Sequence, residues 1–359
     1  MTGLERCVAA VKFQKPDRFP VLPVLLMQGA KELNLPLERY FSKGEFIARG
    51  QLRLLDKFGH DGVLGFPHVV EDVLPFGAGL RYFDDGPPSV DRMCIRKFEE
   101  ISQMVVPEPG NHPQLKQTLQ AIEMLAREVK GKKLIVGAVI GPFSLPSMLM
   151  GTEKYMRLLF GDPEAFRRYF SRLMEICCEF SARWANMQLQ AGADLIVVAD
   201  GIGSGTILRR HECQELALPV NIKFFKQING LIGYEFVGDA EPIIDLYKNQ
   251  GPAVFLVGSS DSMVFCRKKL GKTAALMGNI NNIKLLRWAP ERVEFEIKKM
   301  LQPHSLSDGI IVSNQGPEIP YHVPEENIRA MVKAVEKFSK EKIQASFISS
   351  ATALAAASA

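Results

Sequence analysis

The chain has 359 residues, of which 47% are hydrophobic and 23% charged, and its formal net charge at pH 7 is +4. This composition is typical of a globular protein, and the length suits one large domain or two modest ones. Scattered Lys and Arg residues disfavour nucleic acid as a partner, and the absence of an apolar run of about 18 residues disfavours a membrane. The charged N-terminal residues and the six cysteines, which form no CxxC pair, predict a cytoplasmic protein.

Eight apolar runs along the chain predict strands. Most are apolar throughout rather than alternating, which is typical of parallel strands whose two faces are both covered. Segments with helical periodicity separate them, such as residues 163–192, where Gly192 marks the end of the predicted helix. Eight such units predict an α/β fold, a (β/α)8 TIM barrel in a single domain. The competing fold is a doubly wound sheet, which no Gly-rich phosphate loop supports. The predicted strands cover residues 19–26, 61–66, 134–141, 194–200, 231–239, 253–260, 274–280 and 309–316.

We expect the barrel domain to cover residues 1–340, with an insertion at about 67–133. Within this insertion, the Gly-Pro-Pro turn at 86–88 predicts a small hairpin, and a helix is expected from about Pro113 to Lys130. Residues 341–359 are rich in Ala and Ser and are not expected to belong to the fold. The apolar run at 148–150 suits either a ligand pocket or a subunit contact, so a homodimer is an open possibility.

Polar residues follow several predicted strands, at the end where a TIM barrel builds its active site. Some have an alternative structural role, because His68 could bond a backbone carbonyl, and Asn314 and Gln315 could simply orient the backbone. The residues expected to be catalytic are His68, Asp200, Glu235 and Gln315, and those expected to bind substrate are Met27, Gln28, Met148, Tyr234, Phe236, Asn279 and Asn314.

Glu235 stands inside an otherwise apolar run, residues 231–237. An unpaired buried carboxylate costs several kcal/mol, so this position predicts a partner for the charge. One interpretation is a Lys or Arg inside the barrel. The other is a positively charged ion or substrate, around which Asp200 and Glu235 would gather.

Six stretches resemble, in order and spacing, the uroporphyrinogen decarboxylase superfamily over roughly residues 4–338. The stretches are AAVKFQKPDRFPVLP, VVEDVLPFGAGLRY, GPFSLPSMLMG, YEFVGDAEPIIDLY, AALMGNINNIKLLRWAPERVEFEIKKML and GIIVSNQGPEIPYHVPEENIRAMVKAV. The resemblance implies a barrel. It also implies one of two activities, porphyrinogen decarboxylation or corrinoid-linked methyl transfer.

The residues of the decarboxylase branch are absent. The resemblance places its substrate-binding arginines near Met27 and Lys31, its pyrrole-binding Asp at His68, its Tyr at Met148 and its His at Gln315. A chain without that Asp cannot hold the pyrrole NH groups of a tetrapyrrole. The resemblance therefore favours the methyltransferase branch.

The thiol-methylating members of that branch bind zinc through H-x-C-G-D at the fifth strand and a Cys in G-C-G at the eighth. Here residues 235–239 read EFVGD and residues 314–316 read NQG, so both thiolates are absent and Glu235 replaces the His. The resemblance thus implies zinc bound by Glu235, with Asp200 and His68 as further ligands. Such oxygen and nitrogen ligands would leave zinc a stronger Lewis acid, suited to polarising the oxygen of a methyl ether.

The expected function is transfer of a methyl group from a small methylated donor to a cobalt(I) corrinoid carried by a separate protein. If no zinc is bound, a quaternary amine is the expected donor, with Asp200 and Glu235 holding the cation and Tyr234 or Phe236 as cation–π partners. Two alternatives stay open: transfer from a methylcorrinoid to an acceptor, and a binding subunit that lacks catalysis.

Overall fold

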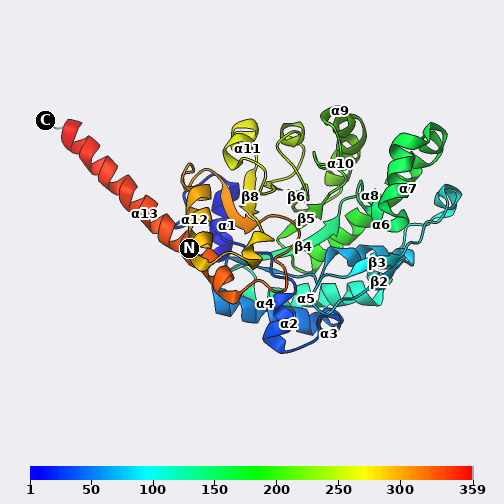
Figure 1. Cartoon of the computed structure of the whole chain (residues 1–359), viewed down its shortest axis with the longest axis horizontal. Helices are drawn as coiled ribbons and strands as arrows, with labels where there is room; N and C mark the ends of the chain where they lie inside the picture. Colours follow the sequence, from blue (N-terminus) through cyan, green and yellow to red (C-terminus); the bar gives the residue numbers. More distant parts are fainter. Residues whose placement is uncertain (358–359) are drawn as a thin grey trace.

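The computed structural model describes the backbone of residues 1–357 and the side chains of residues 1–345. Its main sheet is parallel, with the strand order β1-β4-β5-β6-β7-β8-β9, and curls with helices on its outer side (Figure 1). Seven of the eight predicted strands are confirmed. They are β1 (Gly62–Leu64), β4 (Leu134–Ile140), β5 (Leu195–Ala199), β6 (Leu231–Glu235), β7 (Val254–Leu256), β8 (Ala275–Ile280) and β9 (Ile310–Asn314).

The first predicted run, residues 19–26, forms no regular strand. Val21 makes an isolated parallel bridge with Val312 of β9. The backbone N–H of Leu22 donates to Val312 (2.8 Å), and that of Asp61, beside β1, donates to Val21 (2.9 Å). Pro20 and Pro23 cannot donate to a strand ladder, which explains why the pairing stays this short. The segment nevertheless connects the two edges of the sheet, as ring closure in a barrel requires.

Side chains alternate between the two faces of each strand, and this alternation divides the core. On β5, for example, Leu195 and Val197 belong to a cluster inside the ring, whereas Ile196 and Val198 pack against the surrounding helices. The inner cluster consists of Cys7, Ala10, Leu22, Val24, Leu26, Leu64, Phe66, Leu134, Val136, Ala138, Leu195, Val197, Val254, Leu256, Ala275, Met277 and Ile311.

The helices surround the sheet, and no helix in the described part of the chain is both long and apolar enough to cross a membrane. The helix predicted at 163–192 is confirmed as α8; the Asp162 side chain accepts from the N–H of Ala165 at its start, and Gly192 ends it with φ at 122°. The α-helices are α1 (Gly3–Val11), α2 (Gln28–Leu33), α3 (Leu37–Phe41), α4 (Gly44–Phe58), α5 (Pro113–Val129), α6 (Leu145–Met150), α7 (Thr152–Met156), α8 (Pro163–Ala191), α9 (Arg210–Glu212), α10 (Leu218–Phe225), α11 (Met263–Leu270), α12 (Pro290–Leu301) and α13 (Glu325–Ala357).

The predicted hairpin and helix between the second and third runs are both confirmed. A 3-10 helix, η1 (Val69–Phe76), follows β1 and leads into an antiparallel pair, β2 (Gly79–Arg81) and β3 (Ser89–Arg92). The helix predicted from Pro113 is α5.

The predicted tail continues α13 as far as Ala357, and residues 358–359 lie outside the described residues. The far end of α13 extends away from the rest of the molecule in Figure 1. Its earlier part contacts the fold, because Lys342 Nζ donates to the carbonyl of Gln302 (2.9 Å) and Ile343 packs against the outer core.

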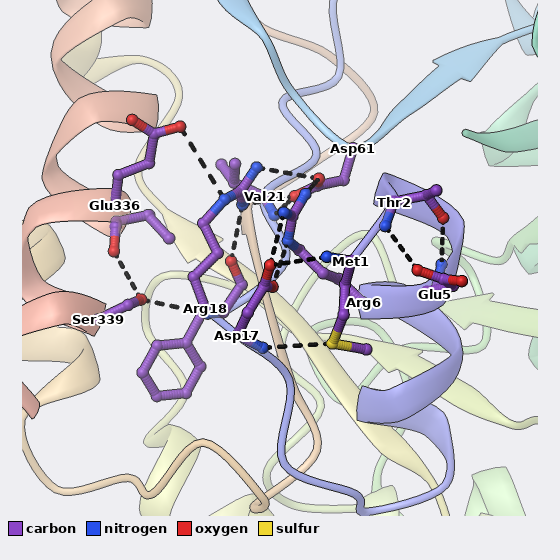
Figure 2. A network of polar contacts seen from close by, with 12 residues as sticks. Met1, Thr2, Glu5, Arg6, Asp17, Arg18, Val21, Asp61, Glu336 and Ser339 are labelled. Carbon is purple, nitrogen blue, oxygen red and sulfur yellow. Dashed lines mark hydrogen bonds and ion pairs between the residues drawn. The ribbon is translucent and has the colours of Figure 1, made fainter. Parts of the chain in front are cut away.

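An ion-pair network around one buried carboxylate, that of Asp61, lies beside the start of β1 (Figure 2). Asp61, which is fully buried, accepts from Arg6 Nη1 (3.0 Å), Arg18 Nη1 (2.7 Å) and the backbone N–H of Val21 (2.8 Å). Arg6 also donates to Asp17 (2.6 Å). The network fixes the first segment against β1 at the N-terminal end of the strands, where a TIM barrel places residues that serve stability.

Candidate active site

A cavity of about 210 Å³ lies inside the ring and extends to the C-terminal ends of the strands. Its walls are mostly apolar side chains of the inner cluster, including Leu64, Val136 and Leu256. Pro87 and Pro88, from the loop between β2 and β3, also line it. The polar side chains that line the cavity come from three different places in the chain and are His68, Glu235 and Glu318; none of the described lining residues is a Lys or Arg.

Glu235 ends β6 and lies in register with Ala199 of β5, which also lines the cavity. Its side chain is buried, and Oε1 has no hydrogen-bond partner among the described residues. Burial raises the pKa of the Glu235 carboxyl from 4.5 to about 7. The predicted internal Lys or Arg partner is therefore absent from the described part of the cavity, and the carboxyl is available to a ligand.

His68 follows β1 in an extended conformation and precedes η1. The ring packs edge-on against Phe41 and Tyr82, with centroid distances of 5.1 and 6.2 Å. Neither ring nitrogen has a partner among the described residues, and burial lowers the pKa of His68 to about 3, so the imidazole is neutral. His68 is thus a neutral group in the cavity that can donate one hydrogen bond and accept another.

Glu318 is a cavity residue that the sequence did not single out. It follows β9 between Pro317 and Ile319, and its backbone is fixed because Asn282 donates to its carbonyl (2.7 Å) and the N–H of Ile319 donates to Val24 (2.9 Å). The residue is 9% exposed, and burial raises the pKa of its carboxyl from 4.5 to about 7. A Glu between apolar residues and prolines is the only signal that sequence could have offered.

Asp200 does not join Glu235, contrary to prediction. It lies one residue beyond Ala199 and therefore points to the opposite face, where it is fully buried. Its carboxylate accepts from Tyr234 OH (2.7 Å), Asn221 Nδ2 (2.8 Å), the N–H of Gly203 (3.0 Å) and Ser144 Oγ. Asp200 thus holds the loops after β4 and β5 from outside the ring.

Tyr234 and Phe236 flank Glu235 in sequence and also point outward. Both are fully buried in the outer core, where Phe236 stacks on Phe255 at a centroid distance of 6.0 Å. Both rings therefore lie away from the cavity, in which we expected them to be cation–π partners.

The predicted zinc ligands are not assembled in this structure. Among the residues that the structure describes, no three His, Cys, Asp or Glu side chains come close enough to hold a metal ion. Asp200 is separated from the other two predicted ligands because it occupies the outer face of the sheet. The donor set therefore does not fit zinc.

Of the other predicted site residues, Met148 lines the cavity. Gln28 does not line the cavity; it is buried and donates through Nε2 to the carbonyls of Ile319 (2.9 Å) and Pro320 (3.0 Å). Met27 is buried in a separate cluster with Leu37 and Tyr40.

Three predicted polar residues connect loops instead of facing the cavity. Gln315 Oε1 accepts from the N–H of Ser259 (2.7 Å), and Asn279 Nδ2 donates to the carbonyl of Gly258 (2.8 Å). Asn314 Oδ1 accepts from the N–H of Val24 (2.8 Å). Their amides are engaged with the protein, which explains these positions without a substrate.

We expect Asp200→Asn to lower the free energy of unfolding by about 1–3 kcal/mol, since the amide keeps only one of two buried acceptor oxygens. Urea unfolding measures this loss. The folded variant should bind cavity ligands as tightly as the wild type in calorimetry. If the variant had normal stability but bound no ligand, Asp200 would contribute to ligand binding after all.

The arrangement defines a parallel β/α barrel whose small, mostly apolar cavity at the C-terminal ends of the strands holds two carboxyl groups and a neutral imidazole. Residues 2–338 match the model of the family described as Uroporphyrinogen decarboxylase (URO-D), and the chain belongs to that family.

Uroporphyrinogen decarboxylases and a methyltransferase are among the proteins that this chain resembles. The uroporphyrinogen decarboxylase of Methylobacillus flagellatus is 25% identical over 95% of this chain and 99% of that protein, and that of Trichlorobacter lovleyi is 26% identical over 82% and 86%. A methyltransferase from Methanosarcina mazei has a similar fold, with a TM-score of 0.83 and 22% identity over 94% of this chain and 99% of the other.

Proposed function

We propose that this protein is a methyltransferase that takes the methyl group from a small methyl ether and delivers it to a cobalt(I) corrinoid carried by a partner protein. The observation that carries the proposal is the Glu235 carboxyl, which is buried in the cavity with Oε1 unpartnered and no Lys or Arg among the described lining residues. The methyltransferase from Methanosarcina mazei supports the general reaction class through its fold.

Glu235 favours a methyl ether as donor because it can supply a proton. The oxygen of an ether is a poor leaving group unless it is protonated as the C–O bond breaks. A carboxyl with its pKa near 7 keeps its proton in a large share of molecules at neutral pH and gives it up readily, which suits a general acid. The O–H of Glu235 would therefore donate to the ether oxygen.

The size of the cavity supports a donor built on one ring. An apolar cavity of about 150 Å³ holds benzene. The volume here, about 210 Å³, leaves room for a methoxy group on such a ring. The apolar walls would exclude water, and His68 could hydrogen-bond to a polar substituent.

In the proposed reaction the bond between the methyl carbon and the ether oxygen breaks, and the oxygen takes the proton of Glu235 to leave as an alcohol or phenol. The partner's corrinoid supplies the cobalt(I) nucleophile to which the methyl group is transferred. The chain itself contributes binding, positioning of the ether group beside Glu235, and the proton. Bulk solvent at the open end can return the proton to Glu235.

Access for the partner protein is supported by apolar side chains on the same rim. Val237 after β6, Val264 on α11 and Ile283 after β8 are exposed. Exposed apolar residues of this kind suit a protein contact.

A quaternary amine donor has less support, because Tyr234 and Phe236 point away from the cavity. Decarboxylation of a porphyrinogen also has less support: His68, Met148 and Gln315 occupy positions where the resemblance expects an Asp, a Tyr and a His.

A donor screen tests the proposal. Purified protein is mixed with a reduced cobalt(I) corrinoid protein and single methyl donors, and the visible spectrum of the corrinoid is followed. Methyl ethers should change the spectrum, with one alcohol or phenol released for each methyl group transferred. Activity only with quaternary amines, only from methylcorrinoid to an acceptor, or with no donor at all would contradict it, and the last result would favour a binding subunit.

A further inference from the structure

The acidic lining of the cavity has a consequence for the charge of its ligand. Two carboxyl groups, on Glu235 and Glu318, line a space whose other walls are mostly apolar, and His68 is neutral. An anion entering this space would lose its hydration without gaining a cationic partner among the described lining residues. Desolvating a charge without compensation is unfavourable, and an ionised carboxylate beside it adds repulsion.

Hydrogen bonds fix the backbone of Glu318 and of the residue after it. Its neighbour Ile319 is fixed on both sides, through its N–H to Val24 (2.9 Å) and through its carbonyl, which accepts from Gln28 Nε2 (2.9 Å). The carbonyl of Glu318 itself accepts from Asn282. The carboxyl, in contrast, makes no hydrogen bond or ion pair with the described residues, and the residue is only 9% exposed. Its oxygens are not among the fully buried atoms without a partner, so they are open to the cavity. A fixed backbone with an unpartnered acid facing the cavity is the arrangement of a residue that acts on a ligand.

We propose that Glu318 is a specificity residue that makes the cavity select uncharged methoxy compounds and reject those that carry a carboxylate. The substrate class of the proposed reaction then narrows to neutral methyl ethers. This inference rests on the proposed function for the ether group, whereas the selection by charge rests on the cavity alone.

A matched ligand pair tests the selection. 4-Methoxybenzamide and 4-methoxybenzoate have nearly the same shape and differ in charge. We expect calorimetry at pH 8 to give a dissociation constant for the benzamide that is smaller by about tenfold or more. The ratio compared is the dissociation constant of the benzoate divided by that of the benzamide. In Glu318→Gln this ratio should fall several-fold because the benzoate binds better, while the affinity for the benzamide stays within about twofold. Glu326→Gln removes an exposed acid at the start of α13 and should leave the ratio unchanged.

A second measurement uses the wild type alone, so the test does not depend on the folding of the variant. Burial raises the pKa of both Glu235 and Glu318 to about 7 and lowers the pKa of His68 to about 3. The preference for the benzamide should therefore be larger at pH 8 than at pH 6.

Equal affinities for the two ligands in the wild type, tighter binding of the benzoate, no binding of the benzamide, or an unchanged ratio in folded Glu318→Gln would each overturn the inference. Neither measurement needs a corrinoid protein. A protein that selects the benzamide but transfers no methyl group would therefore contradict the proposed function and leave the charge selection standing.

Discussion

Glu235→Gln should reduce kcat/KM for methyl transfer from a methyl ether by about 10²–10⁴-fold, the usual contribution of a general acid. The amide has nearly the same size as the carboxyl but cannot give up a proton at neutral pH. The spectral change of a cobalt(I) corrinoid protein measures the rate. Because the cavity shape is kept, the affinity of Glu235→Gln for an uncharged ether should stay close to that of the wild type.

The dependence of the rate on pH shows which protonation state of Glu235 is active. The active form of Glu235 is protonated, and its pKa is raised by burial to about 7, so wild-type kcat/KM should be level at lower pH and fall as the pH rises above 7. Burial raises the pKa of Glu318 to about 7 as well. Glu318→Gln is therefore the matched control and should keep the fall, whereas Glu235→Gln should lose it. A wild-type rate that rises through pH 7 would show that the ionised carboxylate is the active form.

Asp61→Ala should lower the free energy of unfolding by about 3–5 kcal/mol, because it removes a buried carboxylate that accepts from two partly buried Arg side chains and a backbone N–H. Asp61 is fully buried, and Arg18, which donates to both its oxygens, is only 11% exposed (Figure 2). The backbone N–H of Val21 would lose its acceptor as well. Chemical unfolding followed by circular dichroism measures the loss.

Asp17 offers a control within the same network. It also pairs with Arg6, but its side chain is 42% exposed, so Asp17→Ala should cost less than about 1 kcal/mol. An Asp61→Ala protein as stable as Asp17→Ala would mean that the buried pairs do not hold the first segment against β1.

The strands could be predicted from the sequence because a strand that is buried on both faces is apolar throughout. Residues 134–140 and 195–199 are examples of such runs. The segment at 19–26 has the same composition but forms only a bridge at Val21, because two prolines remove donors from the ladder. The ends of a helix could be predicted where capping residues are present, such as Asp162 before α8 and Gly192 after it.

The site could be predicted only in part. Glu235 and His68 could be singled out as candidate site residues because each is a polar residue at the end of an apolar run. A polar group in such a place is costly to bury unless it has a partner. Asp200 follows a similar run, yet β5 and β6 are in register with Ala199 opposite Glu235, so Asp200 is one residue out of phase and faces the other way. Sequence does not reveal this register. Glu318 was missed because loop residues carry no periodicity that indicates which way they point.

The dependence of the rate on the leaving group tests most directly whether Glu235 protonates the leaving oxygen. The rates of methyl transfer from methyl phenyl ether and methyl 4-nitrophenyl ether are compared in the wild type and in Glu235→Gln. Nitrophenolate leaves without a proton far more readily than phenolate, so the loss caused by Glu235→Gln should be large for the first ether and much smaller for the second. An equal loss for both ethers would contradict proton donation by Glu235.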